Sequence, residues 1–177
     1  MKIGVFVGSF DPVHIGHTNV MNYLINKNVV DKVLVIATGN YWHKQNITDL
    51  NHRLNMLDCI KNDNIIIDRK HNKLEYTYQI LDSLKEKYKE DEFYLVLGAD
   101  NANTLLKWKN FEKILENGII IVGRNNIKIS LKGNDKLIFI NKNFGNISST
   151  NIRNNIEEYK SFLDKDVYHY IVKNNLY

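Results

Sequence analysis

The sequence has little cysteine, proline or glycine: one Cys, one Pro and nine Gly among 177 residues. A chain so poor in proline and glycine is neither collagen-like nor a proline-rich linker. Because Cys59 has no second cysteine to pair with, an intramolecular disulfide framework is excluded. Nothing in the cysteine usage therefore indicates an oxidising compartment.

Long hydrophobic runs are also missing. The longest aliphatic stretches, at 33–37 and 119–122, have the length of strands and fall far short of the roughly 20 residues that a membrane helix needs. The first ten residues, MKIGVFVGSF, lack the longer apolar region and the cleavage site of a signal peptide. We therefore expect a soluble, cytoplasmic protein that does not bind membranes.

A strong charge of one sign is absent as well. The chain carries 24 basic and 20 acidic residues, a net charge of +4, and its lysines are scattered rather than gathered in the stripe typical of nucleic-acid binders. No nucleic-acid partner is expected. With 44% hydrophobic and 25% charged residues the composition is that of a globular protein. Its length, against a prior of roughly 150 residues per domain, predicts a single domain over 1–177.

Strand-like runs alternate with amphipathic segments along the chain. We expect strands at 2–7, 32–37, 64–68, 92–100, 118–123 and 136–141, and helices at about 17–27, 49–61, 76–89, 101–107, 110–116, 149–158 and 165–174. Strands separated by helices form βαβ units, which predicts an α/β, Rossmann-like, doubly wound and mainly parallel sheet with helices on both faces. Ligands of such sheets bind beyond the carboxyl ends of the strands.

The loop after the first strand reads GSFDPVHIGH, with His14 and His17 on either side of Gly16 at the expected helix start. A glycine lets a ligand approach the backbone, and the free amides of a first helical turn bind anions. Two imidazoles there can donate hydrogen bonds to phosphate oxygens. One alternative is an ordinary turn in which Asp11 or Ser9 caps the helix and both histidines are exposed. A zinc site is disfavoured, because further cysteines and an HExxH spacing are lacking.

A second candidate for anion binding is ISSTNIR at 147–153. Ser148, Ser149 and Thr150 are good caps for the helix that follows, and their hydroxyls can either cap it or hold a phosphate. Arg153, about one turn along, adds a fixed positive charge suited to a phosphate chain. An ordinary helix cap is the alternative interpretation of the three hydroxyls.

GSFDPVHIGH resembles the HxGH signature of the nucleotidyltransferase superfamily, and ISSTNIR resembles its ISSTxxR signature. Over almost the whole chain the sequence resembles bacterial nicotinate-nucleotide adenylyltransferases, with further matching segments HK at 43–44, HRLNML at 52–57, EYT at 75–77, LGADNANTLLKW at 97–108 and YHYIVKNNLY at 168–177. The resemblance implies a transferase of NAD (pyridine nucleotide) biosynthesis. Such an enzyme moves AMP from ATP to the 5′-phosphate of nicotinate mononucleotide and releases pyrophosphate.

The resemblance also implies roles for individual residues. The catalytic residues are His14, His17, Lys44 and Arg153. ATP is bound by Gly8, Ser9, Phe10, His14, Gly16, His17, Ile147, Ser148, Ser149 and Arg153. Nicotinate mononucleotide is bound by Tyr76, Thr77, Gly98, Asp100, Trp108 and Arg124. Mg²⁺ is expected on the substrate phosphates, with no protein side chain as its ligand. Trp108 as a core residue, Asp100 as a helix cap and Lys44 as a surface residue remain open alternatives.

The chain departs from the family pattern in four places. Tyr41 and Trp42 stand where prolines are common, and they can cover a ligand or contact a second subunit of a homo-oligomer. Glu75 replaces a serine before the Tyr-Thr pair, and Gln79 replaces an aspartate after it. Arg124 is followed by Asn-Asn instead of Pro-Gly.

Rival functions remain. They are adenylyl transfer to nicotinamide mononucleotide or to pantetheine phosphate, cytidylyl transfer, and non-catalytic nucleotide sensing.

Overall fold

A computed structural model describes residues 1–39, 46–123, 135–145 and 147–177. Its six strands form one sheet in the order β3-β2-β1-β4-β5-β6, and every neighbouring pair is parallel. The strands are β1 (Lys2–Gly8), β2 (Lys32–Ala37), β3 (Ile65–Asp68), β4 (Glu92–Gly98), β5 (Gly118–Gly123) and β6 (Leu137–Asn141). The predicted parallel α/β sheet is confirmed.

The strand order reverses at β1, which pairs with β2 on one side and β4 on the other. In doubly wound sheets this reversal sends the loops after the two central strands in opposite directions and opens a crevice between them. The crevice here lies beyond Gly8 and Gly98, the last residues of β1 and β4. The first signature loop starts at this point, whereas the second signature follows β6.

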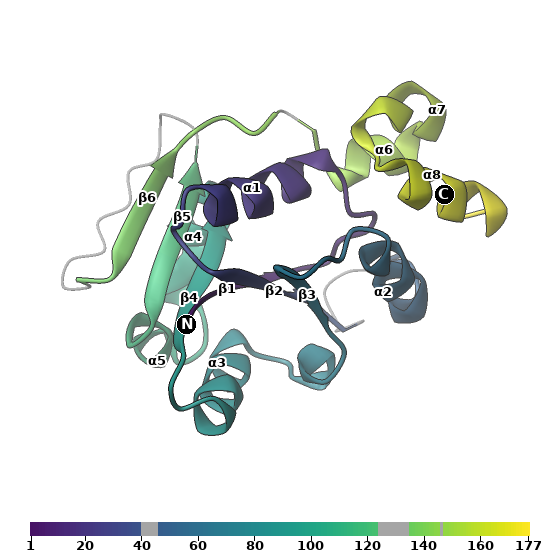
Figure 1. The fold of residues 1–177 in the computed structure, drawn as a ribbon. Helices are drawn as coiled ribbons and strands as arrows, with labels where there is room; N and C mark the ends of the chain where they lie inside the picture. Colours follow the sequence, from purple (N-terminus) through teal and green to yellow (C-terminus); the bar gives the residue numbers. More distant parts are fainter. Residues whose placement is uncertain (40–45, 124–134, 146) are drawn as a thin grey trace.

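Helices cover both faces of the sheet (Figure 1). The α-helices are α1 (Ile15–Asn26), α2 (Leu50–Asp58), α3 (Thr77–Lys87), α4 (Ala99–Thr104), α5 (Phe111–Leu115), α6 (Ser149–Asn154), α7 (Ile156–Tyr159) and α8 (Lys165–Lys173), and the 3-10 helices are η1 (His71–Lys73), η2 (Leu105–Lys107) and η3 (Lys160–Phe162). Helices α1, α2, α6 and α8 bury apolar side chains against one face, and α3, α4 and α5 against the other.

The alternation of side chains along β4 divides the core in two. Tyr94 and Val96 point into the cluster under α1, whereas Phe93, Leu95 and Leu97 point into the cluster under α3. All five are buried, as expected for a strand in the middle of a parallel sheet with both faces covered.

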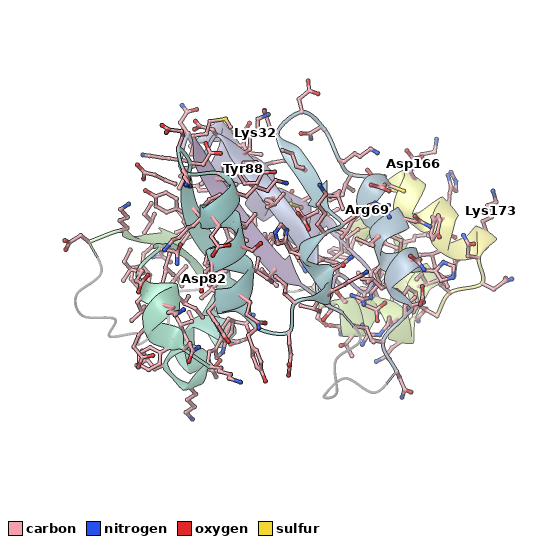
Figure 2. All side chains as sticks on the ribbon, turned by 90° about the horizontal axis from the view of Figure 1, so that it is seen from below. Lys32, Arg69, Asp82, Tyr88, Asp166 and Lys173 are labelled. Carbon is pink, nitrogen blue, oxygen red and sulfur yellow. The ribbon has the colours of Figure 1, made fainter. Side chains whose placement is uncertain are left out.

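The chain after β6 returns to the α1 face of the sheet. Buried Leu163, Val167 and Ile171 form one apolar stripe at a spacing of four residues, and α8 packs beside α2. The Tyr170 hydroxyl accepts a hydrogen bond from Asn55 Nδ2 at 2.9 Å, which links the two helices. Figure 2 shows Asp166 and Lys173 of α8 on the outer side of this layer, where both are exposed. This return brings 147–153 back toward the first loop.

Several element bounds differ from the prediction: α2 ends at Asp58 instead of 61, and β4 ends at Gly98 instead of 100, so that Ala99 and Asp100 belong to α4. Two further differences have a clear cause. α1 begins at Ile15, two residues early, because His14 itself caps it. The segment 149–158 forms two helices, because Asn155, with φ −157° and ψ 84°, leaves the helical region and caps α7 through a bond from Glu158 N to its Oδ1. Among the described residues, no helix combines the length and apolarity needed to span a membrane.

Candidate active site

The two histidines of the first loop cap α1 themselves. Gly16 N donates to His14 Nδ1 at 3.1 Å, and His14 N donates to His17 Nδ1 at 3.3 Å. The alternative of a cap by Asp11 or Ser9 with exposed histidines does not describe this helix, since His14 is only 5% exposed. Because both Nδ1 atoms accept, the proton of each neutral ring lies on Nε2.

The two imidazoles stack on each other inside an aromatic wall. Their ring centroids are 3.8 Å apart, and the Phe10 ring packs edge-on against His17 at 5.0 Å. Burial lowers the pKa of His14 to about 4. The pKa of His17 is also lowered well below its usual value, by burial and then by the neighbouring His14. Both rings are therefore neutral at pH 7 and can donate through Nε2 without carrying a charge.

Gly16 makes room for this arrangement. A Cβ atom at Gly16 would lie 2.9 Å from His14 Cε1 and 3.3 Å from Ile147 Cγ2. Any side chain there would push the His14 ring away from its capping position. The sequence predicts that this glycine admits a ligand, whereas in the structure the nearest groups are His14 and the start of the second signature.

The second signature packs directly against the first. Ser149 Oγ donates to the carbonyl of Pro12 at 2.9 Å, and Arg153 Nη1 donates to the carbonyl of Asp11 at 2.5 Å. These contacts join positions 137 and 142 residues apart. The two segments thus form one wall.

The three hydroxyls have different tasks. Ser148 caps α6 by accepting from Asn151 N at 3.2 Å. Ser149 donates its hydroxyl hydrogen to the Pro12 carbonyl and so stabilises the first loop. Thr150 Oγ1 accepts from Arg153 Nη2 at 3.2 Å and so orients the guanidinium. The alternative of an ordinary cap holds for Ser148.

A cleft of about 670 Å³ lies beyond the carboxyl end of β1. Its lining combines both signatures with the neighbouring loops: Phe6, Val7, Gly8, Ser9, Phe10, Asp11, His17, Asn46, Ile47, Gly98, Asn101, Ser149, Thr150 and Arg153. His17 and Arg153 thus face one space. The Arg153 side chain is 30% exposed, which leaves its positive charge accessible to an anion.

Further cavities continue this cleft in both directions. One of about 640 Å³ shares Phe6 and Gly98 with it and contains Ile147 and Ser148. On the other side, one of about 270 Å³ shares Gly8 and Ser9 with the cleft. A last one, of about 280 Å³, shares Glu75 and Thr77 with that cavity. Together they form an elongated groove along the carboxyl edge of the sheet.

The last cavity contains three residues that the sequence assigns to the mononucleotide: Tyr76, Thr77 and Trp108. Trp108 is half-buried, packs against the core, and donates from Nε1 to Thr104 Oγ1 at 3.2 Å. It is thus neither a fully buried core residue nor a free surface one. Lys109 also lines this cavity and lies 4.3 Å from the centroid of the Tyr76 ring.

Two other residues assigned to the mononucleotide lie elsewhere. Gly98 lines both the central cleft and the cavity that contains Ile147 and Ser148, and Asp100 lines the latter, at the opposite end of the groove. Asp100 is exposed in the first turn of α4, whose N-cap is Gly98, so the alternative of an Asp100 cap does not hold. The structure therefore groups this pair with the expected ATP residues.

Lys44, Arg124, Tyr41 and Trp42 lie outside the described residues. Gln79, a departure from the family pattern, supports the start of α3 by accepting from Tyr76 N at 3.0 Å. Within 1–39, 46–123, 135–145 and 147–177, no group of three or more His, Cys, Asp or Glu side chains could hold a metal ion.

Sequence reasoning missed Arg53. Its side chain is fully buried and donates to three carbonyls: Nε to Thr48 at 2.9 Å, and Nη1 to Ser9 at 2.9 Å and Thr38 at 2.8 Å. It thereby ties together the loops that follow β1 and β2. The sequence did contain a signal for this burial. Arg53 precedes Leu57 by four residues and therefore lies on the apolar face of α2, where a charged side chain is unusual.

The comparisons with known proteins agree with this geometry. The Cytidylyltransferase-like family model matches residues 5–155. The probable nicotinate-nucleotide adenylyltransferase of Flavobacterium johnsoniae is 36% identical, covering 100% of this chain and 99% of that protein. Its counterpart in Clostridium novyi is 35% identical, with 88% and 87% covered.

This chain belongs to the nicotinate-nucleotide adenylyltransferase family. The predicted family is confirmed. Solved structures of adenylyltransferases agree: that of Plasmodium falciparum nicotinic acid mononucleotide adenylyltransferase complexed with NaAD superimposes with a TM-score of 0.84 at 28% identity, covering 99% of this chain and 96% of that one. The same enzyme complexed with APC gives a TM-score of 0.82.

Proposed function

We propose that this adenylyltransferase transfers AMP from ATP to the 5′-phosphate of nicotinate mononucleotide, forming nicotinate adenine dinucleotide and pyrophosphate in NAD biosynthesis. The observation that carries the proposal is the junction of the two signatures, where Ser149 and Arg153 bond to the carbonyls of Pro12 and Asp11. Residues 1–177 would act as one nucleotidyltransferase domain, because both ends of the chain contribute to this wall.

The chemistry requires positioning more than proton transfer. The attacking oxygen belongs to a phosphate that is already ionised near neutral pH, so neither a protein nucleophile nor a strong base is needed. In direct in-line attack on the α-phosphate, negative charge moves toward the departing pyrophosphate. Donors aimed at that charge lower the barrier. The Nε2–H group of His17 and the Arg153 guanidinium, which line the same cleft, would supply such donors. His14 does not line this cleft, and its ring stacks on that of His17.

Mg²⁺ fits this donor set only if it binds through the phosphates of the substrate. Because the described residues offer no cluster of carboxylates, histidines or cysteines, phosphate oxygens and water would form its coordination shell. Bound there, the ion would neutralise charge on the phosphates. Lys44, assigned to the same phosphates, lies outside the described residues.

The far end of the groove suits an anionic pyridine. Trp108 offers a flat ring for stacking, worth on the order of 1 kcal/mol. Glu75 lines the same cavity and by itself would repel a carboxylate, but Lys109 is there too. We propose that Lys109 offsets the Glu75 charge and favours nicotinate over nicotinamide.

The reaction is tested by measuring pyrophosphate release from ATP and Mg²⁺ with each of three acceptors: nicotinate mononucleotide, nicotinamide mononucleotide and pantetheine phosphate. We expect the highest kcat/KM with the first. A higher value with either rival acceptor would reassign the substrate, and no turnover with any of them would favour a nucleotide sensor.

The Lys109 proposal is tested by comparing Lys109→Gln with Lys107→Gln, a matched control at another exposed lysine. Removing the Lys109 charge should lower the preference for nicotinate mononucleotide, measured as its kcat/KM divided by that for nicotinamide mononucleotide, by about 5-fold. This is the range expected for a partly exposed ion pair. An unchanged ratio in Lys109→Gln would exclude this role.

A further inference from the structure

The carboxylate of Asp11 is a buried charge for which the proposed chemistry has no use. Asp11 lies in the first signature loop, is 3% exposed and lines the cleft that also contains His17 and Arg153. A buried carboxylate needs hydrogen-bond donors. Its Oδ2 accepts from Thr48 N at 3.1 Å, and its Oδ1 accepts from the hydroxyl of Tyr177.

This carboxylate lies close to the cation that is to bind ATP. Arg153 Nη1 is 3.9 Å from Asp11 Oδ2, beyond hydrogen-bonding distance, while it donates to the backbone carbonyl of Asp11 at 2.5 Å. A carboxylate and a phosphate compete for a guanidinium, because both accept the same paired hydrogen bonds. A small rotation of the Asp11 side chain would be enough to engage Arg153 and weaken its contact with ATP.

Tyr177 supplies a donor that holds Asp11 in its present position. It comes from a segment 166 residues away, and although the residue as a whole is 41% exposed, desolvation of its phenol and then the bond to Asp11 raise the pKa of that hydroxyl. The hydroxyl therefore stays protonated and donates. The segment is anchored, since Leu176 N donates to Ile171 O at 3.1 Å and the Leu176 side chain packs on the core.

We infer that Tyr177 is a positioning residue for ATP. By donating to Asp11 Oδ1 it holds the carboxylate at its present separation from Arg153, an ion pair at 3.9 Å without a hydrogen bond, so the guanidinium remains available to the phosphates. The inference rests on the proposed function only in assigning the phosphates of ATP to Arg153. It gives a role in substrate binding to a residue outside both signatures.

The test compares Tyr177→Phe with Tyr170→Phe. Each variant loses one hydroxyl, and the Tyr170 hydroxyl is likewise hydrogen-bonded, to Asn55 and His52, at the contact of α8 with α2. For Tyr177→Phe we expect KM for ATP to rise about 10-fold, the effect of losing one hydrogen bond to a charged group, while KM for nicotinate mononucleotide changes less than 2-fold. For Tyr170→Phe we expect neither KM to change by 2-fold.

Binding of α,β-methylene-ATP, measured by calorimetry at a temperature where thermal unfolding shows each variant to be folded, gives a second readout that needs no turnover. It should weaken about 10-fold in Tyr177→Phe alone. The inference is overturned if Tyr177→Phe binds this analogue as the wild type does, or if Tyr170→Phe weakens it equally. If instead the wild-type protein fails to use nicotinate mononucleotide, the proposed function falls, and the binding comparison still decides the role of Tyr177.

Discussion

At the scale of single residues, the two nitrogens of each imidazole have different roles. His14 and His17 use Nδ1 to accept backbone amides at the start of α1, which leaves Nε2–H for a ligand. Histidine is not among the residues that usually cap helices. The sequence therefore indicates two ligand histidines in this loop, but not that the same rings build the helix end that presents them.

His17→Ala should lower kcat by about 100-fold or more, the usual effect of removing one donor to transition-state charge. The variant also loses the bond from His14 N, so a loss of about 1 kcal/mol in unfolding free energy is expected. His169→Ala, at an exposed position, is the control for both readouts. Normal turnover together with a large loss of stability would mean that His17 is only structural.

The pH dependence of stability should report His14. Unfolded, its pKa is near 6.5, whereas burial lowers the folded value to about 4. Between these values the unfolded chain binds more protons, so the free energy of unfolding falls as pH drops from about 6.5 toward 4. In His14→Asn, which keeps an oxygen acceptor for the cap, the loss between pH 7 and pH 5 should be about 2 kcal/mol smaller in urea titrations. Equal losses would contradict the assignment.

At the scale of secondary-structure elements, the site depends on how α6 meets the loop before α1. The strands and amphipathic helices could be predicted from the sequence, and the parallel α/β sheet is confirmed. The break at Asn155 was not, because the amphipathic pattern continues through it while the backbone does not. The sequence also could not show that Ser148 caps α6 while Ser149 donates to the first loop, since serine and threonine can do either.

Ser149→Ala removes the bond to the Pro12 carbonyl and should loosen the wall shared by both signatures. We expect kcat/KM for ATP to fall about 10-fold and unfolding free energy to fall by about 1 kcal/mol. Ser161→Ala, at an exposed position in η3, is the control. If Ser149→Ala keeps full efficiency with ATP, the bond to Pro12 is not needed to align the phosphate site.

At the scale of the whole molecule, the adjoining cavities form one groove because each shares lining residues with the next. His17 and Arg153 lie in the middle, Asp100 and Ile147 toward one end, and Trp108 at the other. A dinucleotide product would occupy both ends at once. Adjacent cavities share lining residues, so each substrate would lie beside the other with its phosphate in the central cleft.

Nicotinate adenine dinucleotide should therefore be displaced by either substrate alone. In equilibrium dialysis with labelled dinucleotide, saturating α,β-methylene-ATP and saturating nicotinate mononucleotide should each lower its binding, because each occupies one half of the groove. Trp108→Ala should weaken the dinucleotide and the mononucleotide by about 5-fold, from lost stacking, but leave the ATP analogue unchanged. If only one substrate competes, the two ends of the groove do not form a single product site.

The sequence by itself determined the fold class, the strand order of appearance along the chain and the two signatures, because periodicity and local motifs are properties of neighbouring residues. Tertiary structure alone decided which groups meet. It joined Ser149 and Arg153 to the first loop, buried Arg53 beneath three carbonyls, brought Tyr177 to Asp11, and separated Gly98 and Asp100 from Trp108. Such contacts connect positions far apart in the chain, and their partners are fixed by how helices and strands pack rather than by any local pattern.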